Sequence, residues 1–306
     1  MISNFTAQSQ KKVRIGPSGV HVFDRTTGLN LLLDEVKLSS TFWATAPRQV
    51  SIALTNICDL SCPYCYAPKN SNSLKFERVA AWLVELDSAG CLGVGFGGGE
   101  PTLYRRFAEL CGYAAKNTGL AITFTTHSHH LNDSLISSLV GNIHFVRISM
   151  DGVDETYEIL RGRPFIDLCR QLKTVRKLAP FGINYVVNAR TLSGLNNAIA
   201  VAVETGATEF LLLPEQPVNG IGGIDSETAK ALNKWVLQYQ GTIPLVISDA
   251  GADGMPVCNP LPHEVGLLAY AHIDALGMIK RSSFDNKGVF IGPEGVIHAL
   301  ENLQAG

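Results

Sequence analysis

The feature that most limits the possible folds is a repeated alternation of short apolar runs with amphipathic helical patterns. Strand-like runs are predicted at residues 49–55, 92–96, 121–126, 143–150, 183–189 and 210–213. Helical patterns follow them at residues 74–89, 104–116, 132–140, 165–178, 195–205 and 226–239. Such alternation is typical of a parallel sheet covered by helices. Six units of this kind fit an open, partial (β/α)6 barrel of the α/β class better than a closed eightfold barrel.

Shorter segments flank this array. Residues 1–47 are predicted to be a β preface, in which the runs 19–24 and 29–34 form an N-terminal β-hairpin around a glycine-containing turn. Residues 48–240 would form the barrel. Residues 241–306 are predicted to be a small α+β extension with a strand at 243–247, a hairpin at 271–281 and a final amphipathic helix. The hairpin turn is expected at Asp274–Gly277.

Three cysteines lie directly after the first predicted barrel strand. Cys58, Cys62 and Cys65 have the spacing C-x3-C-x2-C. Because iron–sulfur clusters are held by cysteine thiolates, three of them on one loop can hold three irons of a cubane cluster. No fourth cysteine is close in the sequence, so one iron would keep an open position, where chemistry takes place. The spacing differs from the C-x2-C pairs of structural zinc sites.

A second motif lies about one strand–helix unit later. Tyr64 directly precedes the last cysteine of the triplet, and Gly97-Gly98-Gly99-Glu100 ends the second strand. With both motifs in this order, the chain resembles the radical S-adenosylmethionine (radical SAM) enzymes. The resemblance implies one [4Fe–4S] cluster on Cys58, Cys62 and Cys65, with S-adenosyl-L-methionine bound to its open iron. An external electron donor such as a flavodoxin or ferredoxin would then drive cleavage of SAM to methionine and a 5′-deoxyadenosyl radical, which abstracts hydrogen from the substrate.

The same resemblance assigns cofactor-binding residues at the ends of the strands. Gly98 and Gly99 would hold the amino group of SAM, while Ser149 would lie near its carboxylate or ribose. Arg161 or Arg163 would anchor SAM or an acidic substrate group, because Arg pairs bidentately with carboxylates. The full set of expected cofactor-binding residues is Tyr64, Gly98, Gly99, Glu100, Ser149, Asp151, Arg161, Asn188 and Leu213.

The third strand ends in a histidine-rich run. His127, His129 and His130 follow it within four positions. Adjacent residues of an extended segment point in opposite directions, so a second metal site is not expected there. His127 is predicted to face the SAM or substrate pocket and to donate or accept a proton after the radical step. Glu215 and Gln216, after the sixth strand, are candidate substrate contacts.

The remaining cysteines divide into two groups. Cys91, Cys111 and Cys169 fit buried positions of helices or strands and are predicted to be structural. Cys258 lies on a loop without periodicity and is a candidate catalytic hydrogen donor. The C-terminal hairpin and helix are similar to SPASM and twitch extensions, which carry auxiliary clusters, but residues 260–306 contain no cysteine. A single cluster is therefore expected.

Composition narrows the possible partners. A net charge of −2 without long Lys/Arg runs argues against nucleic acid or an anionic membrane as a partner. No apolar stretch approaches the roughly 20 residues that span a bilayer. The run Met1–Phe5 lacks a signal-peptide pattern. Seven cysteines, an odd number, do not indicate a disulfide framework. These features predict a cytoplasmic protein.

The leading functional hypothesis is hydrogen abstraction from a peptide or small natural-product substrate, followed by epimerisation, crosslinking or rearrangement. Epimerisation would need a second hydrogen donor, for which Cys258 is the candidate. One alternative is a small-molecule cofactor-biosynthesis enzyme that resembles the molybdenum-cofactor cyclases. A more distant alternative is a non-catalytic iron–sulfur sensor, although a sensor would not need a SAM pocket.

Overall fold

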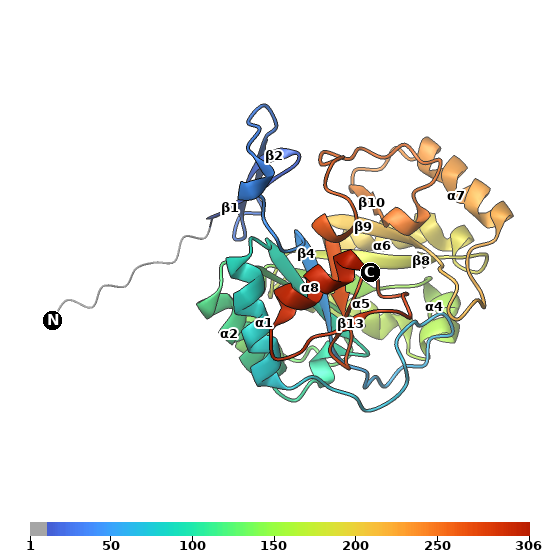
Figure 1. Ribbon diagram of the computed structural model, residues 1–306. Helices are drawn as coiled ribbons and strands as arrows, with labels where there is room; N and C mark the ends of the chain where they lie inside the picture. The colour runs from blue at the N-terminus through green and yellow to red at the C-terminus, as the bar shows by residue number, and fades with distance from the viewer. Residues whose placement is uncertain (1–10) are drawn as a thin grey trace.

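The computed structural model describes residues 11–306; the first ten residues of the predicted β preface, including the Met1–Phe5 run, lie outside the described residues. The centre of the protein is a ten-stranded sheet in the order β10-β9-β8-β7-β6-β5-β4-β11-β12-β13 (Figure 1). Neighbours from β10 to β11 run parallel. Within residues 11–306, the outermost strands β10 and β13 do not pair. The predicted open, partial barrel is confirmed.

The predicted alternation of strands and helices is also confirmed. The six central strands are β4 (Gln49–Thr55), β5 (Gly93–Gly98), β6 (Ala121–Thr126), β7 (Phe145–Ser149), β8 (Phe181–Val187) and β9 (Glu209–Pro214). The predicted helices are α1 (Phe76–Ser88), α2 (Phe107–Asn117), α3 (Asp133–Leu139), α5 (Phe165–Val175), α6 (Leu195–Thr205) and α7 (Ser226–Gln238).

One helix, α4 (Asp154–Arg161), was not predicted. It is only two turns long, and its apolar stripe consists of the buried Tyr157 and Leu160. Gly162 ends it in the left-handed conformation, with φ of 64°, which glycine adopts without steric cost. This short helix places Arg161 at the C-terminal end of β7.

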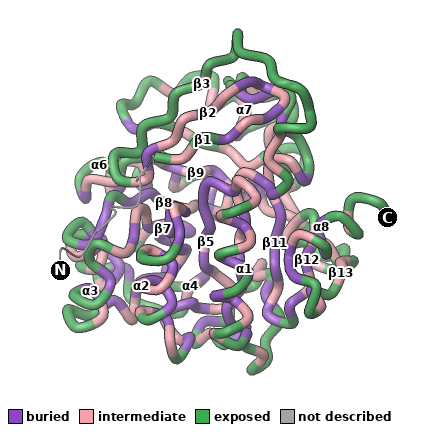
Figure 2. Tube along the Cα trace, turned by 60° about the vertical axis from the view of Figure 1, so that its left-hand side comes forward, coloured by how far each residue is buried: buried purple, intermediate pink, exposed green. Residues whose placement is uncertain are grey.

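The hydrophobic core lies between the sheet and the helices around it. Ile52, Val94, Ile122 and Ile148 of the central strands are fully buried. Because both faces of a parallel sheet are covered, its strands read as nearly continuous apolar runs. Figure 2 shows buried strands behind helices whose outer faces are exposed. No helix among residues 11–306 is long and apolar enough to cross a bilayer.

The C-terminal segment contributes strands at two places in the same sheet. β10 (Leu245–Ile247) pairs with β9, and β11 (Tyr270–Ile273) pairs with β4. β12 (Met278–Lys280) and β13 (Val289–Phe290) continue the sheet antiparallel from β11. The predicted turn is present, since the Gly277 N–H donates to the Asp274 carbonyl at 2.9 Å. Because β11 pairs with β4, the β11–β12 hairpin is held against the first barrel strand.

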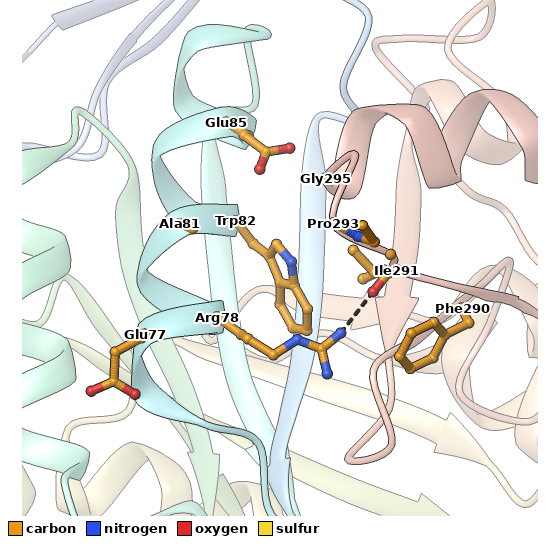
Figure 3. Close-up of a pocket in the computed structure, with 10 residues that line it drawn as sticks. Glu77, Arg78, Ala81, Trp82, Glu85, Phe290, Ile291, Pro293 and Gly295 are labelled. Atoms are coloured by element: carbon orange, nitrogen blue, oxygen red, sulfur yellow. Dashed lines mark hydrogen bonds between the residues drawn. The ribbon is translucent and has the colours of Figure 1, made fainter.

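Helix α8 (Val296–Ala305) is fixed to α1 by polar contacts around a groove of about 460 Å³. The Arg78 guanidinium lies 4.9 Å from the Trp82 ring and 5.1 Å from the Phe290 ring. It also donates a 2.7 Å hydrogen bond to the Ile291 carbonyl (Figure 3). Glu85 accepts from the Val296 N–H at 2.7 Å, which places a carboxylate at the positive end of α8.

The N-terminal unit is a three-stranded sheet rather than a hairpin alone. β1 (Lys11–Gly16) pairs with β2 (Gly19–Asp24), which pairs with β3 (Asn30–Leu33). β1 escaped prediction because its inward position at residue 14 is an arginine. Arg14, 1% exposed, donates to the carbonyls of Ala46 and Gly90 at 2.9 Å and of Leu268 at 3.0 Å. Together with Lys12, which bonds to Asp87, and Arg25, which donates to the Thr118 and Leu120 carbonyls, Arg14 attaches this sheet to the barrel.

Candidate active site

The three cysteines lie on a loop that leaves the C-terminal end of β4, here called the cluster loop (residues 56–75). Its two ends are held together. The Asn56 N–H donates to the Asn72 carbonyl at 2.8 Å, and the Asn56 amide donates to Asn70 Oδ1 at 3.1 Å. Thr55 Oγ1 lies 2.6 Å from Ser73 Oγ. The loop therefore forms a closed turn at the strand end, where parallel barrels place their reactive groups.

Each of the three sulfur atoms has one N–H donor. The Leu60 amide donates to Cys58 Sγ at 3.5 Å, Arg161 Nη1 to Cys62 Sγ at 3.4 Å and Lys69 Nζ to Cys65 Sγ at 3.7 Å. All three cysteines are free and half-buried. Burial raises the pKa of the Cys58 and Cys62 thiols, so these sulfurs favour the protonated form until a metal displaces the proton.

Gly98, the last residue of β5, and Gly99 after it press against the end of β4 and the start of the cluster loop. A Cβ atom on Gly98 would lie 2.1 Å from the Thr55 carbonyl oxygen, and one on Gly99 would lie 2.3 Å from that of Ile57. The Gly99 N–H donates to Thr55 O at 2.7 Å. Glycine is therefore needed at both positions because backbone occupies the space of a side chain. The close approach is made by the end of β4 and the start of the loop, a packing role that the sequence did not reveal.

Glu100 is directed into the protein. Its carboxylate, 1% exposed, accepts from Thr102 and Thr126 hydroxyls at 2.7 Å and from the His127 backbone N–H at 3.0 Å. These bonds join the end of β5 to the end of β6. The predicted cofactor-binding residue thus holds two strand ends in register beside the cluster loop.

Tyr64, Asp151 and Arg161 form a buried polar group. The Tyr64 hydroxyl donates to Asp151 Oδ2 at 2.6 Å, and Arg161 Nη2 donates to the same oxygen. The Val186 N–H donates to Asp151 Oδ1 at 2.8 Å. Burial alone would lower the pKa of Arg161, but the adjacent Asp151 carboxylate outweighs it and raises this pKa. Three predicted residues are therefore brought together, and Arg161 remains charged next to Cys62.

The histidine-rich run acts on the cluster loop through Asp59. His127 Nε2 lies 2.9 Å and His130 Nε2 3.2 Å from Asp59 Oδ1, while Arg163 Nη2 lies 2.7 Å from Oδ2. Ser128, with φ of 68°, makes the turn that gathers the rings. Desolvation opposes ionisation of Asp59, but contact with His130 and His127 outweighs it and lowers its pKa.

The contacts with Asp59 explain why these histidines lie close together, so a second metal site is not needed to explain the cluster. Cys58 Sγ, an Asp59 oxygen and a His127 nitrogen lie within 4.8 Å of one another, but the Asp59 oxygens already contact His127, His130 and Arg163. His127 is 3% exposed, and its Nδ1 accepts from the His129 N–H at 3.2 Å. Both ring nitrogens of His127 are therefore in use within the protein, which favours a positioning role.

The remaining predicted cofactor residues lie at the ends of β7, β8 and β9. The Ser149 hydroxyl is half-buried and, within the described chain, has no hydrogen-bond partner. The Asn188 amide donates to Glu215 at 2.7 Å, and its oxygen accepts from the N–H groups of Arg190 and Thr191. Leu213 is half-buried on β9. Ser149 is thus free to bind a ligand, whereas the Asn188 side chain is already engaged.

A cavity of about 320 Å³ opens beside the cluster loop. Cys65 and Gly98 line it on the barrel side, together with Tyr66. The opposite wall comes from the β11–β12 hairpin and the loop after it, including His272 and Phe284. Cys258 lies outside this lining, on the exposed loop between 252 and 265. Of the predicted substrate contacts, Glu215 and Gln216 lie just before Pro217–Asn219, which do line the cavity.

His272 is a cavity residue that sequence reasoning missed. Its Nδ1 lies 2.7 Å from Ser51 Oγ, which in turn lies 2.5 Å from Tyr270 Oη. Burial lowers its pKa to about 4, so the imidazole is neutral near pH 7. Only the parallel pairing of β11 with β4 places Ser51 opposite His272. No local signal in the sequence reports that pairing.

These residues fit an iron–sulfur cluster and a bound SAM molecule. Three free cysteines, each with an N–H donor, form a thiolate set suited to iron. Arg161 Nε is buried and, among the described residues, has no hydrogen-bond partner, as expected of a donor that faces a ligand. The cavity between Cys65, Gly98 and the C-terminal hairpin provides space next to the sulfurs.

The fold is that of a partial-barrel enzyme, and three free thiols suited to a metal cluster lie at the C-terminal end of its first barrel strand. A model of the radical SAM superfamily matches residues 52–204, half of the chain, and the protein belongs to this superfamily. Members of the superfamily are enzymes that use a [4Fe–4S] cluster and SAM.

Two curated relatives show how far the likeness extends. The sporulation killing factor maturation protein SkfB of Bacillus subtilis is 30% identical over 183 residues, covering 58% of this chain and 43% of SkfB. A probable GTP 3′,8-cyclase of Sulfurisphaera tokodaii is 28% identical over 188 residues, covering 57% of this chain and 58% of the cyclase. The chain thus spans about half the length of the curated relatives that it matches.

Solved structures support the fold. Streptococcus suis SuiB bound to precursor peptide SuiA superposes with a TM-score of 0.74 at 13% identity, covering 98% of this chain and 89% of SuiB. SuiB bound to S-adenosylmethionine gives a TM-score of 0.71 at 14% identity, covering 90% of this chain and 82% of SuiB. At this identity the similarity concerns the architecture alone, which extends over the C-terminal segment as well as the barrel.

Proposed function

We propose that this chain is a radical SAM enzyme that abstracts hydrogen from a peptide and so initiates epimerisation, crosslinking or rearrangement. The observation that carries this proposal is the cavity that Cys65 and Gly98 line together with the β11–β12 hairpin. A substrate in this cavity would lie against the cluster loop. The hairpin and the loop after it would then determine which substrates fit.

The residues of the chain would divide the work as follows. Cys58, Cys62 and Cys65 would hold the cluster, while Ser149 and Arg161 would orient SAM. When bound, the cluster and SAM supply a carbon radical that removes hydrogen from the substrate. Asp59, in contact with His127, His130 and Arg163, would keep the cluster loop against β6.

Two observations favour a peptide as substrate. The relatives include a maturation protein, SkfB, and SuiB crystallised with its precursor peptide. The cavity lining also carries the side-chain amides of Asn72, Asn219 and Asn286, each of which can both donate and accept. Peptide backbones present the same alternation of N–H and C=O groups, so these amides are suited to bind them.

A nucleotide substrate is the second candidate, because one relative is a probable GTP 3′,8-cyclase. A triphosphate needs a concentration of positive charge. The charged side chains of the cavity are Lys280, Asp274 and Asp285, and Lys280 is paired with Asp274 at 2.7 Å. One compensated cation and two carboxylates do not suit a triphosphate. A sensor without catalysis would not need the cavity at all.

The remaining sequence-based assignments stay proposals. A single cluster, an electron donor such as flavodoxin or ferredoxin, and a reducing compartment such as the cytoplasm would fit this chemistry. Cys258 would serve as hydrogen donor only if its loop reaches the substrate, and His127 as proton carrier only if it leaves Asp59. An unchanged product from Cys258→Ala would remove Cys258 from the mechanism.

Deuterium transfer tests the choice of substrate. The reconstituted enzyme is incubated anaerobically with reductant, SAM and either deuterated precursor-type peptides or deuterated GTP, and 5′-deoxyadenosine is analysed by mass spectrometry. We expect deuterium in 5′-deoxyadenosine with a peptide and none with GTP. Transfer from GTP alone would overturn the peptide assignment and favour the cyclase-like reaction.

A further inference from the structure

The three donors to the cluster sulfurs differ in whether they carry a charge and whether a carboxylate compensates it. The Leu60 amide that donates to Cys58 is neutral. The guanidinium of Arg161, which donates to Cys62, is paired with the buried Asp151 carboxylate. Lys69 donates to Cys65 Sγ at 3.7 Å and to the Leu60 carbonyl at 3.1 Å. Among residues 11–306, Lys69 forms no ion pair with a carboxylate, so its charge is not compensated by the protein.

The position of Lys69 relates it to the cluster and to the cavity. Its two hydrogen bonds connect Leu60, which lies between Cys58 and Cys62, with Cys65 at the end of the triplet. Pro68 and Asn70, its neighbours in the chain, both line the cavity. Lys69 itself does not line the cavity, but its ammonium group lies next to Cys65 Sγ, and Cys65 does line it.

A positive charge at this place has a definite electrostatic consequence. Reduction adds an electron to an iron–sulfur cluster, and hydrogen bonds to its sulfurs and nearby charge set its reduction potential. An ammonium group stabilises the more negative, reduced state, so it raises the potential. Because Lys69 is exposed, mobile ions screen part of this effect.

We propose that Lys69 is a redox-tuning residue whose ammonium group, hydrogen-bonded to the Cys65 thiolate, raises the reduction potential of the cluster. The proposal rests on the proposed function, namely that the cysteine triplet holds a [4Fe–4S] cluster. It assigns Lys69 the task of making the cluster easier to reduce by an external donor. Lys69 acts through Cys65, so it is a positioning residue.

An EPR-monitored redox titration of the reconstituted full chain tests this assignment. The variants are Lys69→Met, Lys69→Arg and, as a matched control, Lys75→Met, which removes an exposed lysine at the start of α1. Iron per chain is measured on every sample. We expect Lys69→Met to load as much iron as wild type but to shift the midpoint to a lower potential. Lys69→Arg and Lys75→Met should stay close to wild type, and added salt should narrow the difference for Lys69→Met.

The competing outcomes are distinguishable. A wild-type midpoint in fully loaded Lys69→Met would overturn the tuning role. If Lys69→Met fails to load iron, Lys69→Gln keeps a donor without the charge, and we expect it to load and to show the lowered midpoint. The proposal would be overturned if both variants lost iron, or if Lys69→Gln loaded iron but kept the wild-type midpoint potential. Lys69 would then have only a structural role in the cluster loop. If the reconstituted wild-type protein bound no iron and gave no EPR signal, the proposed function itself would be refuted.

Discussion

The Tyr64 hydroxyl donates a 2.6 Å hydrogen bond to Oδ2 of Asp151, and so joins the cluster loop to the end of β7. Asp151 is 1% exposed and also receives Arg161, which donates in turn to Cys62. The polar end of the aromatic residue before the last cysteine therefore helps to fix the cluster loop on the barrel.

Removal of this hydroxyl should be costly to the fold. In Tyr64→Phe, Asp151 loses one of its buried donors, and a hydrogen bond to a charged group contributes about 1.5–3 kcal/mol. We expect a fall of about 3–6 °C in Tm, measured on reconstituted protein. Tyr113→Phe is the control, because its hydroxyl makes no hydrogen bond within residues 11–306, and its Tm should hardly change. Equal Tm values for both variants would refute the anchoring role.

Asp59 should govern how firmly the cluster loop retains iron. In Asp59→Asn the charge that attracts His127, His130 and Arg163 is lost, so the loop is no longer held against β6. We expect faster iron loss to a chelator, followed optically under anaerobic conditions. The control Asp167→Asn breaks an exposed ion pair with Arg170, which contributes little. If Asp59→Asn lost iron no faster than wild type, this role of Asp59 would be contradicted.

Arg14 should be among the most sensitive positions for stability. It donates to three backbone carbonyls and lies 3.5 Å from Glu264, with both side chains nearly inaccessible. Arg14→Met would leave the Glu264 carboxylate buried with only Arg48 nearby. Breaking such a buried pair destabilises a fold by about 3–5 kcal/mol. Urea unfolding should show this loss, whereas Arg170→Met on the exposed face of α5 should stay within about 0.5 kcal/mol.

The buried His272 predicts a pH dependence of stability. Burial lowers its pKa from the ordinary value of 6.5 to about 4 in the folded chain, so below pH 6.5 the unfolded chain binds the proton more readily. Stability should therefore fall as the pH drops from 6.5 towards 4, by up to about 3 kcal/mol from this residue.

Comparison with His272→Gln isolates this contribution. We expect the Tm of wild type to fall more steeply than that of the variant between pH 7 and pH 5 (about two units that span this titration). Identical slopes would show that His272 is not held neutral by burial.

The sequence predicted the elements whose patterns are local. The strands at 49–55 and 121–126 and the helix at 195–205 have the predicted bounds, because periodicity and glycine stops define them. Helix α4 is too short for its periodicity to be distinctive, and β1 is concealed by the inward Arg14. The parallel pairing of β10 and β11 with the barrel depends on contacts across the chain.

The candidate site, too, was predicted where its signal is local and missed where it depends on distant contacts. Cys58, Cys62 and Cys65 are recognisable because three ligands lie on one loop. The partners of Asp59 come from two segments distant in the sequence, and the role of His272 depends on Ser51, which lies on another strand. Side chains such as Glu100 and Asn188 lie close to predicted positions but turn toward protein groups. A strand end can be predicted locally, whereas the direction of its side chains is set by their neighbours.

The most direct test of the central claim is anaerobic reconstitution followed by reduction in the presence of SAM, with 5′-deoxyadenosine measured by mass spectrometry and iron on the same sample. We predict about four irons per chain and formation of 5′-deoxyadenosine, both lost in Cys62→Ala and both retained in Cys258→Ala. A chain that binds a full cluster and SAM but yields no 5′-deoxyadenosine, even with peptide substrates supplied, would contradict the assignment of this site to radical chemistry.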